Sequence, residues 1–205
     1  AENLQTYLDY GIGTVFFSAT LLPIHYYRKL LSVEKDDYAI YAETSFPDEN
    51  RLLLQGNAVS ARYTMRGEVM YRRIARYIAE AVVGRKGNYM AFFPSYRMME
   101  DVYDIFLEQA DGIESVMQMQ SMSETQREEF LEQFEYEREK SFVGFCVMGG
   151  VFSEGIDLTE DRLIGAVIVG TGLPQVCNDR EIIKSYFDAE DGRGFEYAYL
   201  YPGMN

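Results

Sequence analysis

Histidine and cysteine are scarce in this sequence of 205 residues, and their scarcity excludes several kinds of site. The single histidine, His25, has no cysteine or second histidine beside it in the chain, which favours a packing or surface role. Cys146 and Cys177 lie far apart and form no C-x-x-C pair, so we expect neither a metal site nor a disulfide scaffold. Cys146 lies in an apolar run and is expected to be a buried thiol.

Long apolar runs are lacking as well. The longest early run, Val15–Leu22, is interrupted by Ser18 and Thr20 and is far shorter than the roughly 20 residues that cross a bilayer. From the first residues of this sequence we expect no signal peptide. We therefore expect a folded, cytoplasmic domain with no membrane partner, in agreement with the sparse cysteines.

Positive charge is in deficit, because 19 Lys and Arg residues stand against 33 Asp and Glu residues, a formal net charge of -14. This balance argues against a dedicated nucleic-acid-binding protein. The segment Arg62–Lys86 differs, since it holds seven basic residues and two acidic ones. A solvated helix face and a surface that contacts phosphates are both consistent with that segment.

Apolar, β-rich segments alternate along the chain with segments of helical periodicity. We expect strands at Thr14–Ser18, Asn88–Phe93, Ser115–Met119, Phe142–Met148, Gly165–Val169 and Tyr197–Tyr201. We expect helices at Pro23–Leu31, Gly67–Val83, Tyr96–Gln109, Ser123–Glu137 and Asp179–Phe187. The alternation predicts an α/β fold with a mostly parallel central sheet and helices on both faces.

A separate pattern interrupts this alternation near the beginning of the chain. Tyr38–Ala42 and Arg51–Leu54 are rich in residues that favour strands, and they flank a turn at Phe46–Asn50. These segments predict a small subregion over residues 36–62.

Ligands of open parallel sheets bind beyond the carboxyl ends of the strands, so the segments that follow the strands are the candidate sites. Thr20 follows the first expected strand, where a helix cap and an anion-binding role are both open. Ser95 and Tyr96 follow the second. Ser95 is either a simple helix N-cap or a phosphate contact, and Tyr96 is suited to stacking on a base.

The most specific segment, GGVFSEGIDL (Gly149–Leu158), follows the expected strand Phe142–Met148. Its glycines allow close approach of the backbone to a ligand and leave amide groups free to bind anions. Carboxylates such as Glu154 and Asp157 repel phosphates, but they suit sugar hydroxyls, a hydrated cation or an arginine of a facing domain. This density of glycine and acid favours a functional loop over a purely structural turn.

Taken in order, these segments resemble the second helicase lobe of the DinG/XPD-like branch of superfamily 2. FFSATL (Phe16–Leu21) resembles motif III of that branch, GNYMAFFPSY (Gly87–Tyr96) resembles motif IV, and GGVFSEGIDL resembles motif V. VGTGLP (Val169–Pro174) is similar to the turn that comes next in the family. The likeness covers nearly all of residues 1–205 and implies a RecA-like three-layer sandwich from an ATP-dependent DNA helicase.

The resemblance also implies roles for particular residues. Such helicases clamp ATP between two RecA-like lobes while they move along single-stranded DNA. Glu154, Gly155 and Asp157 match the family positions that face the ATP cleft and act in catalysis, and Thr20 matches the position that links this cleft to the DNA. The residues implied to contact single-stranded DNA are Ser95, Tyr96, Ser153, Arg62, Arg66 and Arg73.

Other parts of the family pattern are missing from the sequence. It has no G-x-x-x-x-G-K-[ST] and no DEAH-like motif, so the groups that hold Mg²⁺ and the ATP phosphates are expected in the first helicase lobe, the implied partner. The 4Fe-4S cysteines of the family also belong to that lobe, and two distant cysteines cannot supply four ligands. The sequence stops at Asn205 before the arginine-rich motif VI, so we expect this fragment not to hydrolyse ATP alone.

Two other function classes stay open at this point. A nucleic-acid-binding module could share the RecA-like shape without motor activity. An unrelated α/β enzyme with a glycine-rich site has less support, because the sequence has no G-x-S-x-G motif and no catalytic cysteine–histidine pair.

Overall fold

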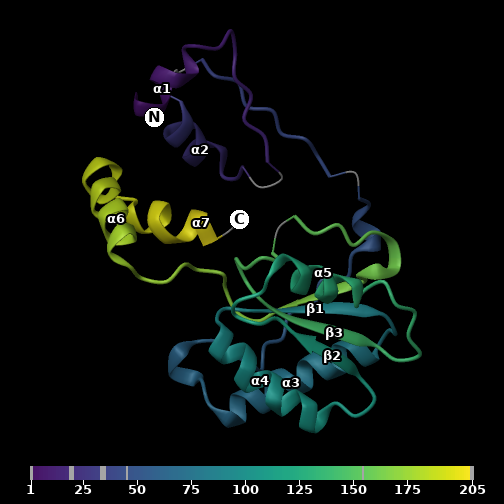
Figure 1. Ribbon diagram of the computed structural model, residues 1–205. Helices are drawn as coiled ribbons and strands as arrows, with labels where there is room; N and C mark the ends of the chain where they lie inside the picture. Colours follow the sequence, from purple (N-terminus) through teal and green to yellow (C-terminus); the bar gives the residue numbers. More distant parts are fainter. Residues whose placement is uncertain (1, 19–20, 33–35, 45, 154, 204–205) are drawn as a thin grey trace. The chain divides into compact units, whose positions relative to one another are not determined.

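The computed structural model describes residues 2–18, 21–32, 36–44, 46–153 and 155–203. The chain divides into two compact units. One unit consists of residues 54–172, and the other joins residues 1–53 to residues 173–205. Each is described separately below, with its helices and strands labelled as in Figure 1.

A parallel sheet of four strands forms the centre of the unit made by residues 54–172. The strands lie in the order β2-β3-β1-β4. Their bounds are β1 (Asn88–Phe93), β2 (Glu114–Met117), β3 (Phe142–Val147) and β4 (Gly165–Ile168). Because all four run in one direction, their carboxyl ends meet at one edge of the sheet.

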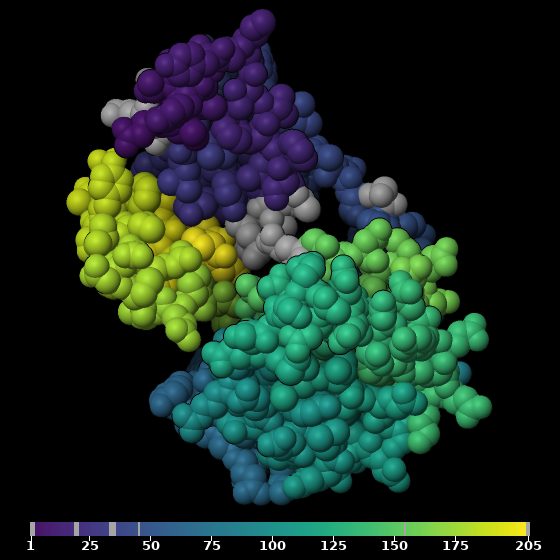
Figure 2. Space-filling view, in the orientation of Figure 1, coloured from purple at the N-terminus to yellow at the C-terminus, as the bar shows by residue number. Residues whose placement is uncertain are grey.

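Helices cover both faces of this sheet. On one face lie α3 (Glu68–Val83) and α4 (Tyr96–Gln109), and on the other lies α5 (Glu124–Glu132) (Figure 1). Two short 3-10 helices, η2 (Tyr63–Met65) and η3 (Glu160–Arg162), complete the unit. In space-filling view, the atoms of this unit, coloured blue to green, are closely packed (Figure 2). The three-layer α/β architecture expected from the sequence is confirmed.

The two central strands are buried on both faces, and their side chains alternate between two cores. Phe93 and Phe145 stack at 5.5 Å between ring centroids in the core beneath α3 and α4. Phe142 and Cys146 point the other way, into the core that contains Phe130 of α5. This double burial explains why both strands are continuous apolar runs in the sequence.

Serine caps fix the starts of two helices. Ser95 is the N-cap of α4, and its Oγ accepts a hydrogen bond from the backbone N–H of Met98 at 3.4 Å. Ser123 and Gln126 form a reciprocal capping box at the start of α5. That helix ends at Glu132 rather than near Glu137, which leaves Phe134 in the following turn to pack against the sheet.

The second unit is helical in its described part. It contains α1 (Glu2–Leu8), α2 (Ile24–Leu31), the 3-10 helix η1 (Asp48–Asn50), α6 (Asn178–Asp191), the π-helix η4 (Glu196–Leu200) and α7 (Tyr201–Gly203). Phe187 of α6 stacks on Tyr197 at 4.1 Å, and Tyr26 of α2 lies 5.3 Å from Tyr197. Lys29 and Asp191 form an ion pair at 3.0 Å beside these rings. The ion pair and the ring contacts join the two distant parts of the sequence.

The prediction of a strand at Tyr197–Tyr201 is wrong, because this segment is helical. Tyrosine favours strands only where neighbouring strands offer a surface on which to pack. Here Tyr197 and Tyr201, four residues apart, lie 5.5 Å from each other and each contacts the ring of Tyr26. Packing on one side of a helix outweighs the strand preference.

The strands expected at Thr14–Ser18, Tyr38–Ala42 and Arg51–Leu54 are wrong as well. None of these residues pairs with a strand in the described part of the chain, and Val15 and Phe17 are 83% and 90% exposed. An apolar, β-rich sequence forms a strand only when another strand satisfies its backbone groups. Residues 36–62 fall on both sides of the division at Leu53, and the subregion expected there stays a prediction.

Among the described residues, no helix is both long enough and apolar enough to cross a membrane.

Gly144 of β3 provides a test of the packing between α5 and the sheet. A Cβ at this position would lie 2.6 Å from Phe134 Cζ, so Gly144→Ala is expected to lower the free energy of unfolding by about 1–3 kcal/mol. The measurement is urea denaturation. Gly84→Ala is the matched control, because its Cβ would meet only ordinary contacts and should change stability little. Equal stability of the two variants would contradict the packing described here.

Candidate functional site

The carboxyl edge of the sheet gathers the segments that the sequence singles out. Ser95 and Tyr96 follow β1, Gly149–Leu158 follows β3, and Gly170-Thr171-Gly172 follows β4. β1 lies between β3 and β4, so the three segments extend from adjacent strands of one sheet. The expectation that they share one edge is confirmed for the part of them that the structure describes.

Tyr96, the first residue of α4, is half-buried and packs against the core beneath that helix. Its hydroxyl accepts a hydrogen bond of 2.8 Å from Nε2 of Gln118. Ser95 precedes it as the helix cap, so its hydroxyl is already engaged with the backbone of α4. Both side chains are held by the fold at the edge where the sequence places them.

Gln118 is a residue that the sequence reasoning missed. It directly follows β2 and is only 2% exposed. Its backbone N–H donates to the carbonyl of Phe145 at 2.9 Å, and its side-chain Oε1 accepts from the backbone N–H of Val147 at 3.0 Å. A lone glutamine after a short strand gives no pattern to notice, and only the structure shows what its amide group contacts.

The loop after β3 is anchored at its base and open further along. Gly149 and Gly155 adopt φ angles of 69° and 73°, which favour glycine, and a Cβ on either would meet no atom within 4 Å. Ser153 is exposed and donates from Oγ to the carbonyl of Val147 at 3.2 Å. Phe152 is buried against Phe130, with ring centroids 4.3 Å apart. Contacts of Phe152 and Ser153 with the sheet and α5 thus hold the first half of the loop, and Gly155 further along is exposed.

Asp157 lies in the accessible part of this loop and is exposed, as is Gly155. Glu154 lies outside the described residues, and so does Thr20 in the earlier segment. The structure therefore brings Ser153, Gly155 and Asp157 together on one loop. It leaves the predicted placement of the other two untested.

Several arginines of the basic segment Arg62–Lys86 already have partners within the protein, so not all of them are available to bind phosphates. Arg72 pairs with Glu68 at 2.9 Å and with Glu108 at 3.6 Å, and Arg76 pairs with Glu80 at 2.7 Å. Arg66 donates from Nε to the carbonyl of Ala61 at 3.2 Å. Among the predicted DNA contacts, the side chains of Arg62 and Arg73 are exposed and form no ion pair within the described residues.

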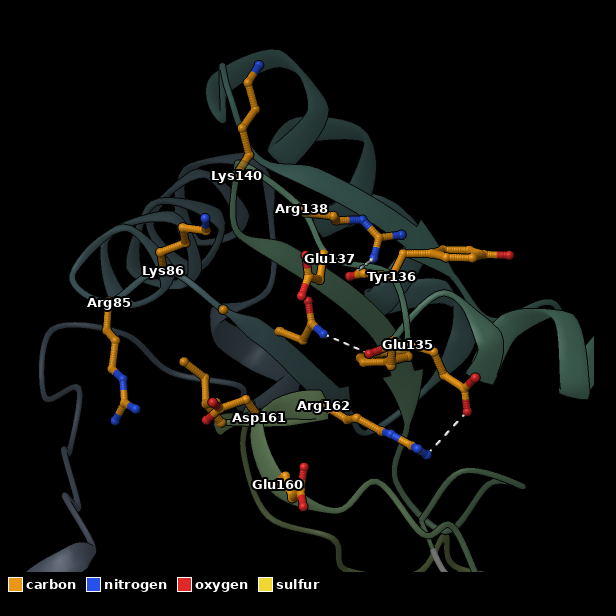
Figure 3. A pocket seen from close by; sticks show the side chains of 14 residues that line it. Arg85, Lys86, Glu135, Tyr136, Glu137, Arg138, Lys140, Glu160, Asp161 and Arg162 are labelled. Carbon is orange, nitrogen blue, oxygen red and sulfur yellow. Dashed lines mark hydrogen bonds and ion pairs between the residues drawn. The ribbon is translucent and has the colours of Figure 1, made fainter.

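A cavity of about 470 Å³ lies at the opposite, amino end of the strands (Figure 3). It is lined by basic groups such as Arg85 and Lys140 and by acidic groups such as Glu137 and Asp161. Arg162 pairs with Glu135 at 3.2 Å across it. The mixture of both signs gives this cavity no clear preference for an anion or a cation.

Metal ligands are not clustered in the described residues, where no group of three or more His, Cys, Asp or Glu side chains could hold an ion. Cys146 is buried in β3 and Cys177 is exposed before α6, and both are free thiols. Two cysteines cannot supply the four ligands of an iron–sulfur cluster.

Comparison with known proteins identifies relatives of this chain. The family model for the helicase C-terminal domain matches residues 78–205, which include the segments after β1, β3 and β4. The chain belongs to this family. This helicase C-terminal domain is also similar to the ATP-dependent DNA helicase XPD of Sulfolobus acidocaldarius, with 26% identity over 99 residues. The alignment covers 46% of this chain and 18% of that protein.

Two solved structures, titled XPD apo and XPD helicase, share the fold of this helicase C-terminal domain. Both give a TM-score of 0.56, at 21% and 22% sequence identity. The matches cover 71% and 73% of this chain and 29% and 26% of those chains. The fold predicted by the resemblance is therefore confirmed, and the chain spans less than a fifth of the length of the curated relative (18%).

The two cysteines of this helicase C-terminal domain are expected to differ sharply in reactivity. Burial raises the pKa of the Cys146 thiol to about 12, so it stays protonated at pH 8, and the thiolate is the nucleophile. A thiol-specific disulfide reagent at pH 8 should modify Cys177 rapidly and Cys146 only after denaturation. Cys177→Ser is the control that should abolish the fast phase. Two fast equivalents in the native protein would contradict the burial of β3.

Proposed function

We propose that residues 1–205 form the second RecA-like lobe of an ATP-dependent DNA helicase that moves along single-stranded DNA. The observation that carries the proposal is the anchored, glycine-rich loop after β3 at the carboxyl edge of a sheet in a helicase C-terminal domain. Such edges are where nucleotides bind in open α/β sheets. The relative whose name includes ATP-dependent DNA helicase supports the same activity.

In this proposal the exposed end of the loop faces ATP. Gly155 leaves room for close approach to a ligand, and the Asp157 carboxylate is free to bind a sugar hydroxyl, hydrated Mg²⁺ or an arginine across the cleft. Glu154 is assigned to the same role from its place in the motif, and Thr20 to the link between the nucleotide and the DNA. The first helicase lobe is the partner that supplies the phosphate-binding loop, the Mg²⁺ ligands and any iron–sulfur cluster.

The proposed DNA path uses the other side chains of this edge and the basic segment. The half-buried ring of Tyr96 is assigned to base stacking, and Ser153, whose hydroxyl donates to the Val147 carbonyl, is assigned to the DNA path together with the glycine amides beside it. Ser95 contributes mainly by fixing the start of α4. Exposed Arg62 and Arg73 are the strongest candidates for phosphate contacts, and Arg66 is constrained by its bond to Ala61.

The ATPase activity of the intact protein, with and without single-stranded DNA, tests this function directly. Stimulation by DNA is the expected result, because movement along DNA requires hydrolysis to respond to the bound strand. DNA binding without any hydrolysis would instead identify a binding module of RecA-like shape. Absence of both activities would contradict the proposal.

Asp157→Asn in the intact protein is expected to lower the DNA-stimulated kcat by about tenfold or more, because a neutral amide holds a hydrated Mg²⁺ or an arginine across the ATP cleft less well than a carboxylate does. Steady-state ATPase assays give this number. Asp161→Asn is a matched control, since Asp161 is also exposed but lies in η3, beyond the loop. A wild-type kcat for Asp157→Asn would remove this carboxylate from the site.

Arg73→Gln is expected to weaken single-strand binding and to reduce the slope of log K against log salt by about 0.7, the value for one lost phosphate contact. Fluorescence anisotropy over a range of salt concentrations measures the slope. Arg76→Gln, one turn along the same helix, is the control because Arg76 is already paired with Glu80. If both variants change the slope equally, the loss reflects general charge and not a contact at Arg73.

A further inference from the structure

We propose that Gln118 is a positioning residue that holds the start of α4 and the loop after β3 in one arrangement, and so couples DNA contact to the nucleotide site. The inference rests on the proposed function for the roles of those two segments. Its basis is a pair of hydrogen bonds made by one buried side-chain amide.

The need for Gln118 begins with the unequal lengths of two neighbouring strands. β2 ends at Met117, which pairs with Phe145, whereas β3 continues to Val147. Beyond that point the outer edge of β3 has no strand partner among the described residues. The backbone N–H of Val147 donates instead to Oε1 of Gln118. A side chain thus accepts the hydrogen bond that a longer β2 would accept.

The same amide group reaches the other segment. Its Nε2 donates to the hydroxyl of Tyr96 at 2.8 Å, and both polar ends of the side chain are therefore engaged. Because Gln118 is only 2% exposed, water does not replace either hydrogen bond. A shift of Tyr96 away from this position leaves a buried donor without its partner, which ties the ring to the end of β3.

Val147 connects Gln118 to the loop after β3 through its backbone carbonyl. Its carbonyl accepts from the backbone N–H of Gly150 at 3.1 Å and from Ser153 Oγ at 3.2 Å. A Cβ on Gly150 would lie 2.9 Å from that carbonyl oxygen and 3.2 Å from Gln118 Nε2, so the turn is packed directly on the amide group. From Tyr96 to Ser153, each step is a hydrogen bond or a close contact, and Asp157 lies four residues further along.

The test measures the DNA concentration that half-saturates ATPase stimulation of the intact protein. Tyr96→Phe keeps the ring that can stack on a base and removes only the hydroxyl. Gln118→Met keeps the size of the side chain and removes both hydrogen bonds. Each is expected to raise the half-saturating DNA concentration by about three- to tenfold, the range of a single hydrogen bond.

The double variant distinguishes coupling from separate damage. If one bond carries the effect, Tyr96→Phe adds almost nothing to Gln118→Met, whereas independent roles give multiplied losses. Gln118→Glu is the conservative variant, because its carboxyl group can accept from both Val147 N–H and the Tyr96 hydroxyl. The half-saturating DNA concentration of Gln118→Glu should lie within about twofold of the wild-type value.

Tyr103→Phe is the matched control. Tyr103 lies on the same helix and is also half-buried, but its hydroxyl is 3.4 Å from Ser115, away from the loop after β3. It should leave the DNA dependence unchanged, and thermal unfolding of every variant separates loss of fold from loss of coupling.

The inference would be overturned if the single variants melt earlier yet keep the wild-type half-saturating DNA concentration. It would also be overturned if their effects on that concentration multiply in the double variant. Wild-type protein without DNA stimulation would count against the proposed function itself.

Discussion

The parallel pairing of β1 with β3 over six residues is the interaction on which the rest of the unit depends. It sets Phe93 opposite Val147, so that both strands finish at the same level. The segments that carry Ser95 and Tyr96 and the loop with Ser153 and Asp157 therefore leave the sheet side by side. The two cores on either face hold this pairing in place, because alternate side chains of both strands enter each core.

Much of this unit could be predicted from the sequence. β1 and α4 were predicted with the bounds that the structure gives, since double burial makes a continuous apolar run and a serine marks the helix start. The start of α5 is predicted equally well, because the expected helix begins at Ser123, the residue that caps it. The shared edge of the candidate loops followed from the expectation of parallel strands. Motif resemblance then indicated the family that comparison with known proteins confirmed for residues 78–205.

The misses have a common physical cause, because each depends on contacts that are distant in sequence. Val15 and Tyr197 both belong to β-rich segments. Val15 is exposed and has no strand partner in the described part of the chain, whereas Tyr197 packs within a helix. The contacts of Gln118 depend on the unequal lengths of β2 and β3, which no local sequence pattern encodes. The sequence of the basic segment does not distinguish its arginines from one another. In the structure, Arg72 and Arg76 form ion pairs with glutamates of the same helix.

The ion pair between Lys29 and Asp191, with the rings around it, has a consequence for how the protein is made. The contacts of residues 54–172 are complete once that stretch has been synthesised, so this unit can fold while the ribosome is still working. The helical unit must wait, because α2 has no buried residue of its own, and the rings of α6 and η4 that it contacts emerge more than a hundred residues later. During that interval the apolar side chains of α2 stay exposed to solvent, whereas the cores on both faces of the sheet are already formed.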